Sequence, residues 1–348
     1  MYPISAADAI SPAIQRTRTF LFRPFRLGTY LKLCVVALLT EGLGGSGNFN
    51  TGHHYTNHKT TVESFAPFAF TPERIAEAVF AFLLVMLLCF WIYYLITRLR
   101  FAFFHCLIHN IKEIRPGWHI YREPATRFFW LNFVVGLCFL LLVALIAIPF
   151  AAGFLGLFHN IAAGGHPDLG SILALVLPLI PIILVLVLLG IAVDVVLRDL
   201  MLPHYALEDA TAGQAWSAVW ARISAAKGSF LGYAVLRVLL PIVAMIGLFI
   251  VLILPAIIFA VVVVGIEVVL HAAFSGASGG AALVGIFLQV LVGVIAAALA
   301  LLAWIVIGGP LSTAIRQYAL IFYGSRYPAL GNILFPPPPV AQPAPGTA

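Results

Sequence analysis

Residues able to do chemistry gather in the stretch "DVVLRDLMLPHYALED", from Asp194 to Asp209. It holds four carboxylates, one arginine and one histidine, in a chain of which only 9% is charged. An acid, a base or a set of metal ligands could come from four of these residues: Asp199, His204, Glu208 and Asp209. Their spacing matches no catalytic or metal-binding fingerprint. The sequence therefore predicts no catalytic, metal or cofactor site here.

A helix leaving a membrane explains the same stretch better. Asp194 would lie inside the cytoplasmic end of a span, Arg198 and Asp199 would mark its exit, and Pro203 would end the helix. Asp194 and Arg198 are four residues apart, so they can pair on one helix face. Further on, Asp209 and Thr211 suit the N-cap of a following helix.

Ionisable residues inside apolar segments are candidates for function, because charge is costly in lipid. Asp194 and Arg237 are two such residues, and we favour a structural pair between neighbouring helices over a transport path. Glu41 and Glu267 are predicted toward the outer leaflet without an obvious partner. They could line a polar path or reach the outer headgroups.

A polar loop, "GNFNTGHHYTNHKT", holds three histidines: His53, His54 and His58. Their spacing can bind zinc or copper, but no carboxylate or cysteine is adjacent, and we expect a solvated loop without metal. The neighbouring "EGLGGSG" is not followed by the lysine and helix start of a phosphate-binding loop.

The rest of the chain is built for lipid. Of its 348 residues, 62% are hydrophobic, whereas soluble domains are usually about a quarter charged. The net charge of +6 does not indicate nucleic acid, because the basic residues flank apolar segments instead of forming a patch. We therefore predict an all-α polytopic transmembrane helical bundle with the lipid bilayer as its partner, together with membrane proteins.

Six candidate spans reach about the 20 residues that a bilayer requires: 27–45, 75–97, 128–152, 170–197, 229–254 and 281–308. The first is the weakest, because only "LCVVALLT" is unbroken. Residues 229–270 are almost continuously apolar and too long for one bilayer crossing, which predicts a break at Pro255. Residues 255–280 are then either re-entrant or a seventh span.

The distribution of basic residues predicts the orientation. With both termini cytoplasmic, all but four of the 19 Lys and Arg residues fall on the cytoplasmic side. The exceptions are Lys32, Lys59, Arg74 and Arg237. We expect the protein to reside in the cytoplasmic (inner) membrane of a bacterium. We divide the chain into a cytoplasmic amphipathic segment 1–26, a transmembrane domain 27–334 and a Pro-rich disordered tail 335–348.

An internal repeat is suggested by two similar segments. "ADAISPAIQRTRTFLFRPFRLGTYLKL" resembles "AGQAWSAVWARISAAKGSFLGYAVL", and "HIYREPATRFFWLNFVVGL" is a looser third copy. We predict three units, each a cytoplasmic amphipathic interfacial helix followed by a transmembrane hairpin. Trp216 and Trp220 in the second segment suit a position at the headgroups.

Three blocks carry a resemblance to a family: "ISPAIQRTRTFLFRPFRLGTYLKL", "EGLGGSGNFN" and "VDVVLRDLMLPHYALEDATAGQAWSAVWARI". They resemble an uncharacterised group of bacterial multi-pass membrane proteins. The last block is distantly similar to the membrane domain that accompanies some glycerophosphodiester phosphodiesterases, with Asp199 and Pro203 matching its D-x-x-x-P pattern. No phosphodiesterase catalytic domain is present, so the resemblance does not imply that activity.

Three functional hypotheses follow. We favour a non-catalytic membrane scaffold or accessory protein. A transporter of ions or small molecules would place Asp194, Arg237 and Glu267 along one path. A membrane-embedded enzyme would bring the Asp, His and Glu side chains of the opening stretch together at a cytoplasmic-face pocket.

Overall fold

The computed structural model describes residues 3–42, 72–164, 168–276 and 278–336, and these form helices and turns without any strand. The prediction of an all-α polytopic bundle is confirmed. The helices, in chain order, are α1 (Ile10–Phe22), α2 (Leu27–Ala37), the π-helix η1 (Leu38–Gly42), α3 (Pro72–His109), α4 (Ile114–Ile120), α5 (Arg122–Ala162), α6 (Leu169–Val176), α7 (Leu179–Val195), the π-helix η2 (Val196–Met201), α8 (Leu202–Leu207), α9 (Ala212–Ala225), α10 (Lys227–Phe274), α11 (Gly280–Gly324) and α12 (Pro328–Leu334).

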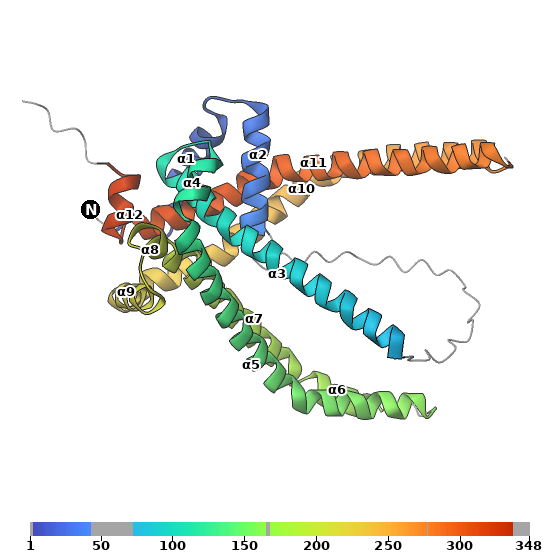
Figure 1. Cartoon of the computed structure of the whole chain (residues 1–348), viewed down its shortest axis with the longest axis horizontal. Helices are drawn as coiled ribbons and strands as arrows, with labels where there is room; N and C mark the ends of the chain where they lie inside the picture. Colours follow the sequence, from blue (N-terminus) through green and yellow to red (C-terminus); the bar gives the residue numbers. More distant parts are fainter. Residues whose placement is uncertain (1–2, 43–71, 165–167, 277, 337–348) are drawn as a thin grey trace, which may run out of the picture.

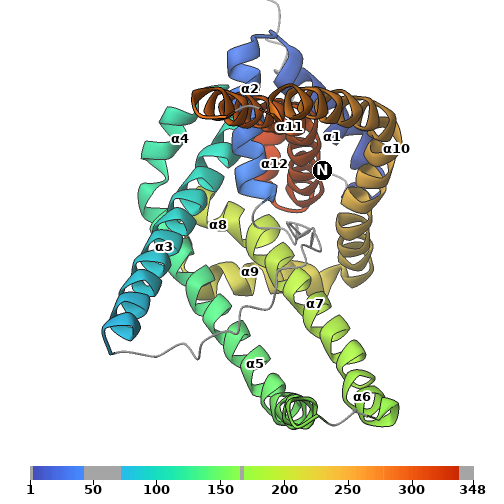
Figure 2. The ribbon, with the colours of Figure 1, turned by 90° about the vertical axis from the view of Figure 1, so that its right-hand side faces the viewer.

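The molecule consists of a compact base from which long helical arms extend (Figure 1). Helices α10 and α11 form one arm, α5 with α6 and α7 a second, and α3 a third; the arms diverge from the base, as the rotated view shows (Figure 2). Five helical segments of the described chain are long and apolar enough to cross a membrane. Five of the six predicted spans lie on them.

Each arm carries a charged residue where it leaves the base, and a long run without charge follows toward the tip. These residues are Arg98, Arg127, Asp194, Arg237 and Arg316. The arms expose leucine, isoleucine, valine and phenylalanine along their length. Such continuous apolar surface is stable only in lipid, where a helix satisfies its own backbone. The protein is therefore a membrane protein.

The prediction of a break at Pro255 was wrong. Helix α10 continues through both Pro241 and Pro255 for 48 residues, which is about 72 Å. Pro is tolerated inside transmembrane helices when its surroundings compensate for the lost hydrogen bond. Residues 255–274 are thus the outer part of α10, and α11 returns beside it.

The first predicted span, 27–45, corresponds to α2 and η1, which cross α11 near Gly309 (Figure 1). A Cβ atom on Gly309 would lie 2.3 Å from Cys34 Cβ, so only glycine permits this crossing. The Tyr30 hydroxyl donates to the Val306 carbonyl at 2.7 Å. Because residues 43–71 are not described, the number of spans stays a prediction.

The short helices α1, α4 and α9 precede α2, α5 and α10 in the chain. Whether the three units are true repeats stays a prediction. The histidine loop and nearly all of the Pro-rich tail lie outside the described residues.

Candidate functional site

Two π-helical segments hold three charged residues of the base: Glu41 in η1, and Arg198 and Asp199 in η2. A π-turn adds one residue to the helical turn and is frequent at functional sites. In η2, the consecutive residues Arg198 and Asp199 are both buried, with 2% and 0% of their surface exposed. In η1, the Thr40 carbonyl accepts hydrogen bonds from Arg100 Nε at 3.1 Å and from Arg198 Nη2 at 3.0 Å. The Arg198 carbonyl accepts one from Arg316 Nη1 at 2.9 Å.

Asp199 is the most enclosed carboxylate of the group. Its Oδ2 accepts hydrogen bonds from Arg237 Nε and from the Tyr233 hydroxyl, both at 2.7 Å. Its Oδ1 accepts one from Arg316 Nη1 at 2.8 Å. Three elements, η2, α10 and α11, are joined by this single side chain. The residue predicted to mark the exit of a span at the interface is therefore fully buried within the protein.

Glu41 extends the network to η1. Its Oε2 accepts a hydrogen bond from Arg198 Nη2 at 2.9 Å and lies 3.6 Å from Arg237 Nη2. Its Oε1 lies 3.7 Å from Arg316 Nε. The prediction that Glu41 has no obvious partner was therefore wrong, because it shares one site with arginines from three other elements.

The predicted pair of Asp194 and Arg198 is present at 2.9 Å. The predicted alternative partner, Arg237, binds Asp199 and Glu41 instead. We call the seven ionisable residues of this network the charge cluster: Glu41, Arg100, Asp194, Arg198, Asp199, Arg237 and Arg316. Four arginines face three carboxylates, so the ionised cluster carries one positive charge.

Burial of so many charges is tolerated only when they neutralise one another. Removing one partner of a buried pair typically costs 3–5 kcal/mol, because the other charge is left uncompensated. The charge cluster therefore holds η1, η2, α10 and α11 in one arrangement at the point where the apolar arms begin.

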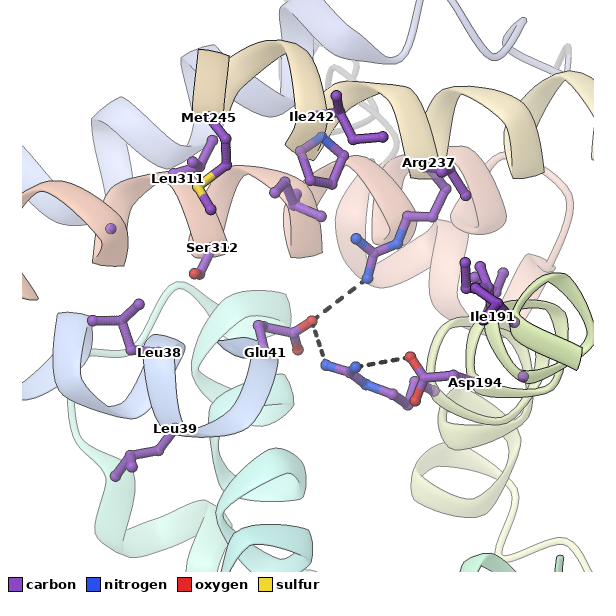
Figure 3. Close-up of a pocket in the computed structure, with 18 of the residues that line it drawn as sticks. Leu38, Leu39, Glu41, Ile191, Asp194, Arg237, Ile242, Met245, Leu311 and Ser312 are labelled. Carbon is purple, nitrogen blue, oxygen red and sulfur yellow. Dashed lines mark hydrogen bonds and ion pairs between the residues drawn. The ribbon is translucent and has the colours of Figure 1, made fainter. Parts of the chain in front are cut away.

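A cavity of about 1600 Å³ opens beside the charge cluster. Glu41, Asp194, Arg198 and Arg237 all line it. Figure 3 shows the side chains of Glu41, Asp194 and Arg237 pointing toward one another. Apart from Ser312, its other walls are apolar residues of α2, η1, α5, α7, α10 and α11. Asp194 is the most accessible of the four charged side chains, with 36% of its surface exposed, and Arg237 follows with 11%.

A second polar group surrounds His204, which is fully buried. Its Nδ1 lies 2.9 Å from Glu208 Oε2, and its Nε2 lies 2.7 Å from the Tyr323 hydroxyl. Because a carboxylate only accepts hydrogen bonds, we assign the Nδ1 proton as the donor to Glu208. Burial is the largest single influence and would raise the pKa of Glu208, but hydrogen bonds from His204 and Tyr327 and the positive charge of Arg222 together lower that pKa. This group lies outside the large cavity.

The predicted catalytic set is not brought together. Asp199 belongs to the charge cluster, whereas His204 and Glu208 form the second group. Asp209 pairs instead with Arg127 at 3.3 Å, on the surface. Pro203 does not end the helix, since α8 continues to Leu207. The predicted cap at Thr211 is confirmed, because Thr211 and Gln214 form a capping box for α9.

Glu267 lies far along α10, outside the cavity and without an ion pair to any described residue. Sequence reasoning missed three residues of the network: Arg100, Tyr233 and Arg316. Arg316 and Arg100 were assigned to the cytoplasmic boundary by charge alone. No glycine or proline directly follows Arg100 or Arg316 in the sequence, and each helix continues past its arginine. That continuity is the feature of the sequence that could have placed both arginines inside the base.

Across the described ranges, no three His, Cys, Asp or Glu side chains lie close enough to hold a metal ion. The three histidines considered for metal binding lie between residues 42 and 72, outside the part of the chain that the structure describes.

Comparison with curated proteins finds no match, and comparison with solved structures finds none either. One family model matches residues 4–333, which is nearly the whole chain. It covers the charge cluster, the cavity and the second polar group. The chain belongs to this family, described as a family of unknown function (DUF7544).

Proposed function

We propose that the protein is a non-catalytic scaffold or accessory protein of the bacterial cytoplasmic membrane, with its base toward the cytoplasm. The observation that supports this most is the mutual neutralisation in the charge cluster. Asp199 accepts bonds from two arginines and one tyrosine, and Glu41 lies among three arginines. Groups so occupied hold helices in place and are not free to act as acid, base or nucleophile.

The surface of the base supports the same proposal. Trp216 and Trp220 of α9 stack with ring centroids 6.0 Å apart and expose 50% and 57% of their surfaces. Exposed tryptophans on an amphipathic helix suit the headgroup region of a bilayer or a membrane protein partner. The excess of basic residues at the base supports the cytoplasmic orientation.

Transport is the second candidate, favoured by one observation: Asp194 and Arg237 line the same large cavity. The predicted third member of the path, Glu267, does not line it. The enzyme hypothesis has less support, because its residues lie in three separate places.

Native gel electrophoresis of mildly solubilised membranes, followed by protein quantification, tests the scaffold proposal. A scaffold migrates in a complex with other proteins, and its deletion lowers the amounts of those same proteins. His204→Gln, in the second polar group, should leave such a complex intact once the variant is shown to fold. If the chain migrates alone and deletion alters only the uptake or efflux of a solute, transport replaces scaffolding.

A further inference from the structure

We propose that the cavity beside the charge cluster binds one membrane lipid with a zwitterionic headgroup, whose ammonium contacts Asp194 and whose phosphodiester contacts Arg237. This inference goes beyond the scaffold proposal and would hold equally for a transporter.

The size and lining of the cavity indicate a large apolar occupant. Its volume of about 1600 Å³ exceeds the roughly 300–1,000 Å³ of ordinary small-molecule pockets. Residues such as Leu38, Phe139, Ile242 and Trp304 line it from four different elements. Acyl chains are the apolar material that surrounds these helices in a bilayer.

The accessible charges at its polar side are one of each sign. Asp194 uses Oδ2 to bind Arg198, and no described residue donates a hydrogen bond to its Oδ1. Arg237 uses Nε and Nη2 to bind Asp199 and Glu41, and its Nη1 makes no hydrogen bond to a described residue. One carboxylate oxygen and one guanidinium nitrogen are thus available.

A zwitterion complements this pair better than an anion or a cation does. An ammonium offers three donors to a carboxylate, and a guanidinium recognises a phosphodiester well. An anionic headgroup would be repelled by Asp194, the most exposed charged side chain of the cavity. A simple cation would bind Asp194 but would leave the available guanidinium nitrogen of Arg237 without a partner. In Figure 3, Asp194 and Arg237 lie at the same side of the cavity, with the apolar side chain of Ile242 next to Arg237.

Native mass spectrometry of the purified full chain tests the proposal, using micelles with equal amounts of phosphatidylethanolamine and phosphatidylglycerol. We expect one phosphatidylethanolamine to be retained in preference to phosphatidylglycerol. Asp194→Asn should reduce this preference at least tenfold, and Asp194→Glu should restore most of it. Glu267→Gln is the matched control, because it removes an ionisable side chain of an arm outside the cavity, and it should change nothing.

A second variant tests the cavity without changing any charge, so its result does not depend on whether the Asp194 variants fold. Ile242→Trp fills the apolar part of the cavity and leaves every charge in place, so it should also abolish retention. The proposal is overturned if phosphatidylglycerol is retained equally, or if Asp194→Asn and Ile242→Trp keep the preference. It is also overturned if a long-chain alkylamine without phosphate competes as well as phosphatidylethanolamine. Each of these results leaves the scaffold proposal to its own test.

Discussion

Glu41 and Arg198 are 157 positions apart in the sequence, yet Glu41 Oε2 accepts a hydrogen bond from Arg198 Nη2 at 2.9 Å. Both side chains are buried, with 7% and 3% of their surfaces exposed. Their pairing places the end of the first apolar segment at the level where α7 turns into η2. The rest of the charge cluster assembles around this contact.

Loss of the Asp199 charge should destabilise the base strongly. Asp199→Asn leaves Arg237 and Arg316 without their closest carboxylate, and such a loss costs about 3–5 kcal/mol. We expect a clear drop in the midpoint of thermal unfolding in detergent, followed by tryptophan fluorescence.

Asp209→Asn is the control for this variant. Asp209 has 64% of its side chain exposed, so its surface pair contributes only about 0–1 kcal/mol. Asparagine also tolerates the positive φ of 49° at this position. Equal effects of the two variants would contradict a structural role of the charge cluster.

The crossing of α2 and α11 should not tolerate a side chain at Gly309. Gly309→Ala places a Cβ atom 2.6 Å from Cys34 Cα, so backbone must move, at a cost of about 1–3 kcal/mol. Gly293→Ala lies on the same helix with nothing within 4 Å of its Cβ position. A stability loss in Gly309→Ala alone, measured by thermal unfolding, is the expected result; similar stabilities would count against the crossing.

Acidic pH should remove the contribution of the Glu208 carboxylate to the stability of the fold. Because the pKa of Glu208 is lowered in the folded chain, its carboxylate stabilises the fold above its ordinary pKa of about 4.3. This contribution disappears as the pH falls through the lower folded pKa. The difference in unfolding midpoint between the wild type and Glu208→Gln should thus be constant near neutral pH and shrink toward pH 4. A difference that grows on acidification would refute the assignment of Glu208 as an ionised hydrogen-bond acceptor.

The long apolar segments could be predicted from the sequence because lipid imposes a length and a composition on each helix that crosses it. The same reasoning placed Arg198 and Asp199 at the exit of a span, since charged residues usually lie where a helix leaves the lipid. It could not foresee the π-turn of η2, which buries both side chains. Nor could it pair Glu41 with Arg198, because that contact depends on the angle at which α2 crosses α11, which is set by Gly309.

At Pro255 a local sequence rule predicted a helix boundary that the structure does not have. Proline breaks helices in water, but α10 continues through it, so the local rule gave the wrong boundary in an apolar arm. The distribution of charge-free runs was more informative than any single proline.

Disulfide formation in native membranes, on a background without the four natural cysteines, tests the central claim most directly. Gly308 Cβ would lie 3.0 Å from Leu38 Cδ2, so Leu38→Cys with Gly308→Cys should cross-link readily on mild oxidation. Leu38→Cys with Gly293→Cys should not, since Gly293 lies about 22 Å farther along α11. Cross-linking of the second pair instead of the first would show that the first apolar segment follows α11 across the membrane, and that Glu41 does not reach the charge cluster.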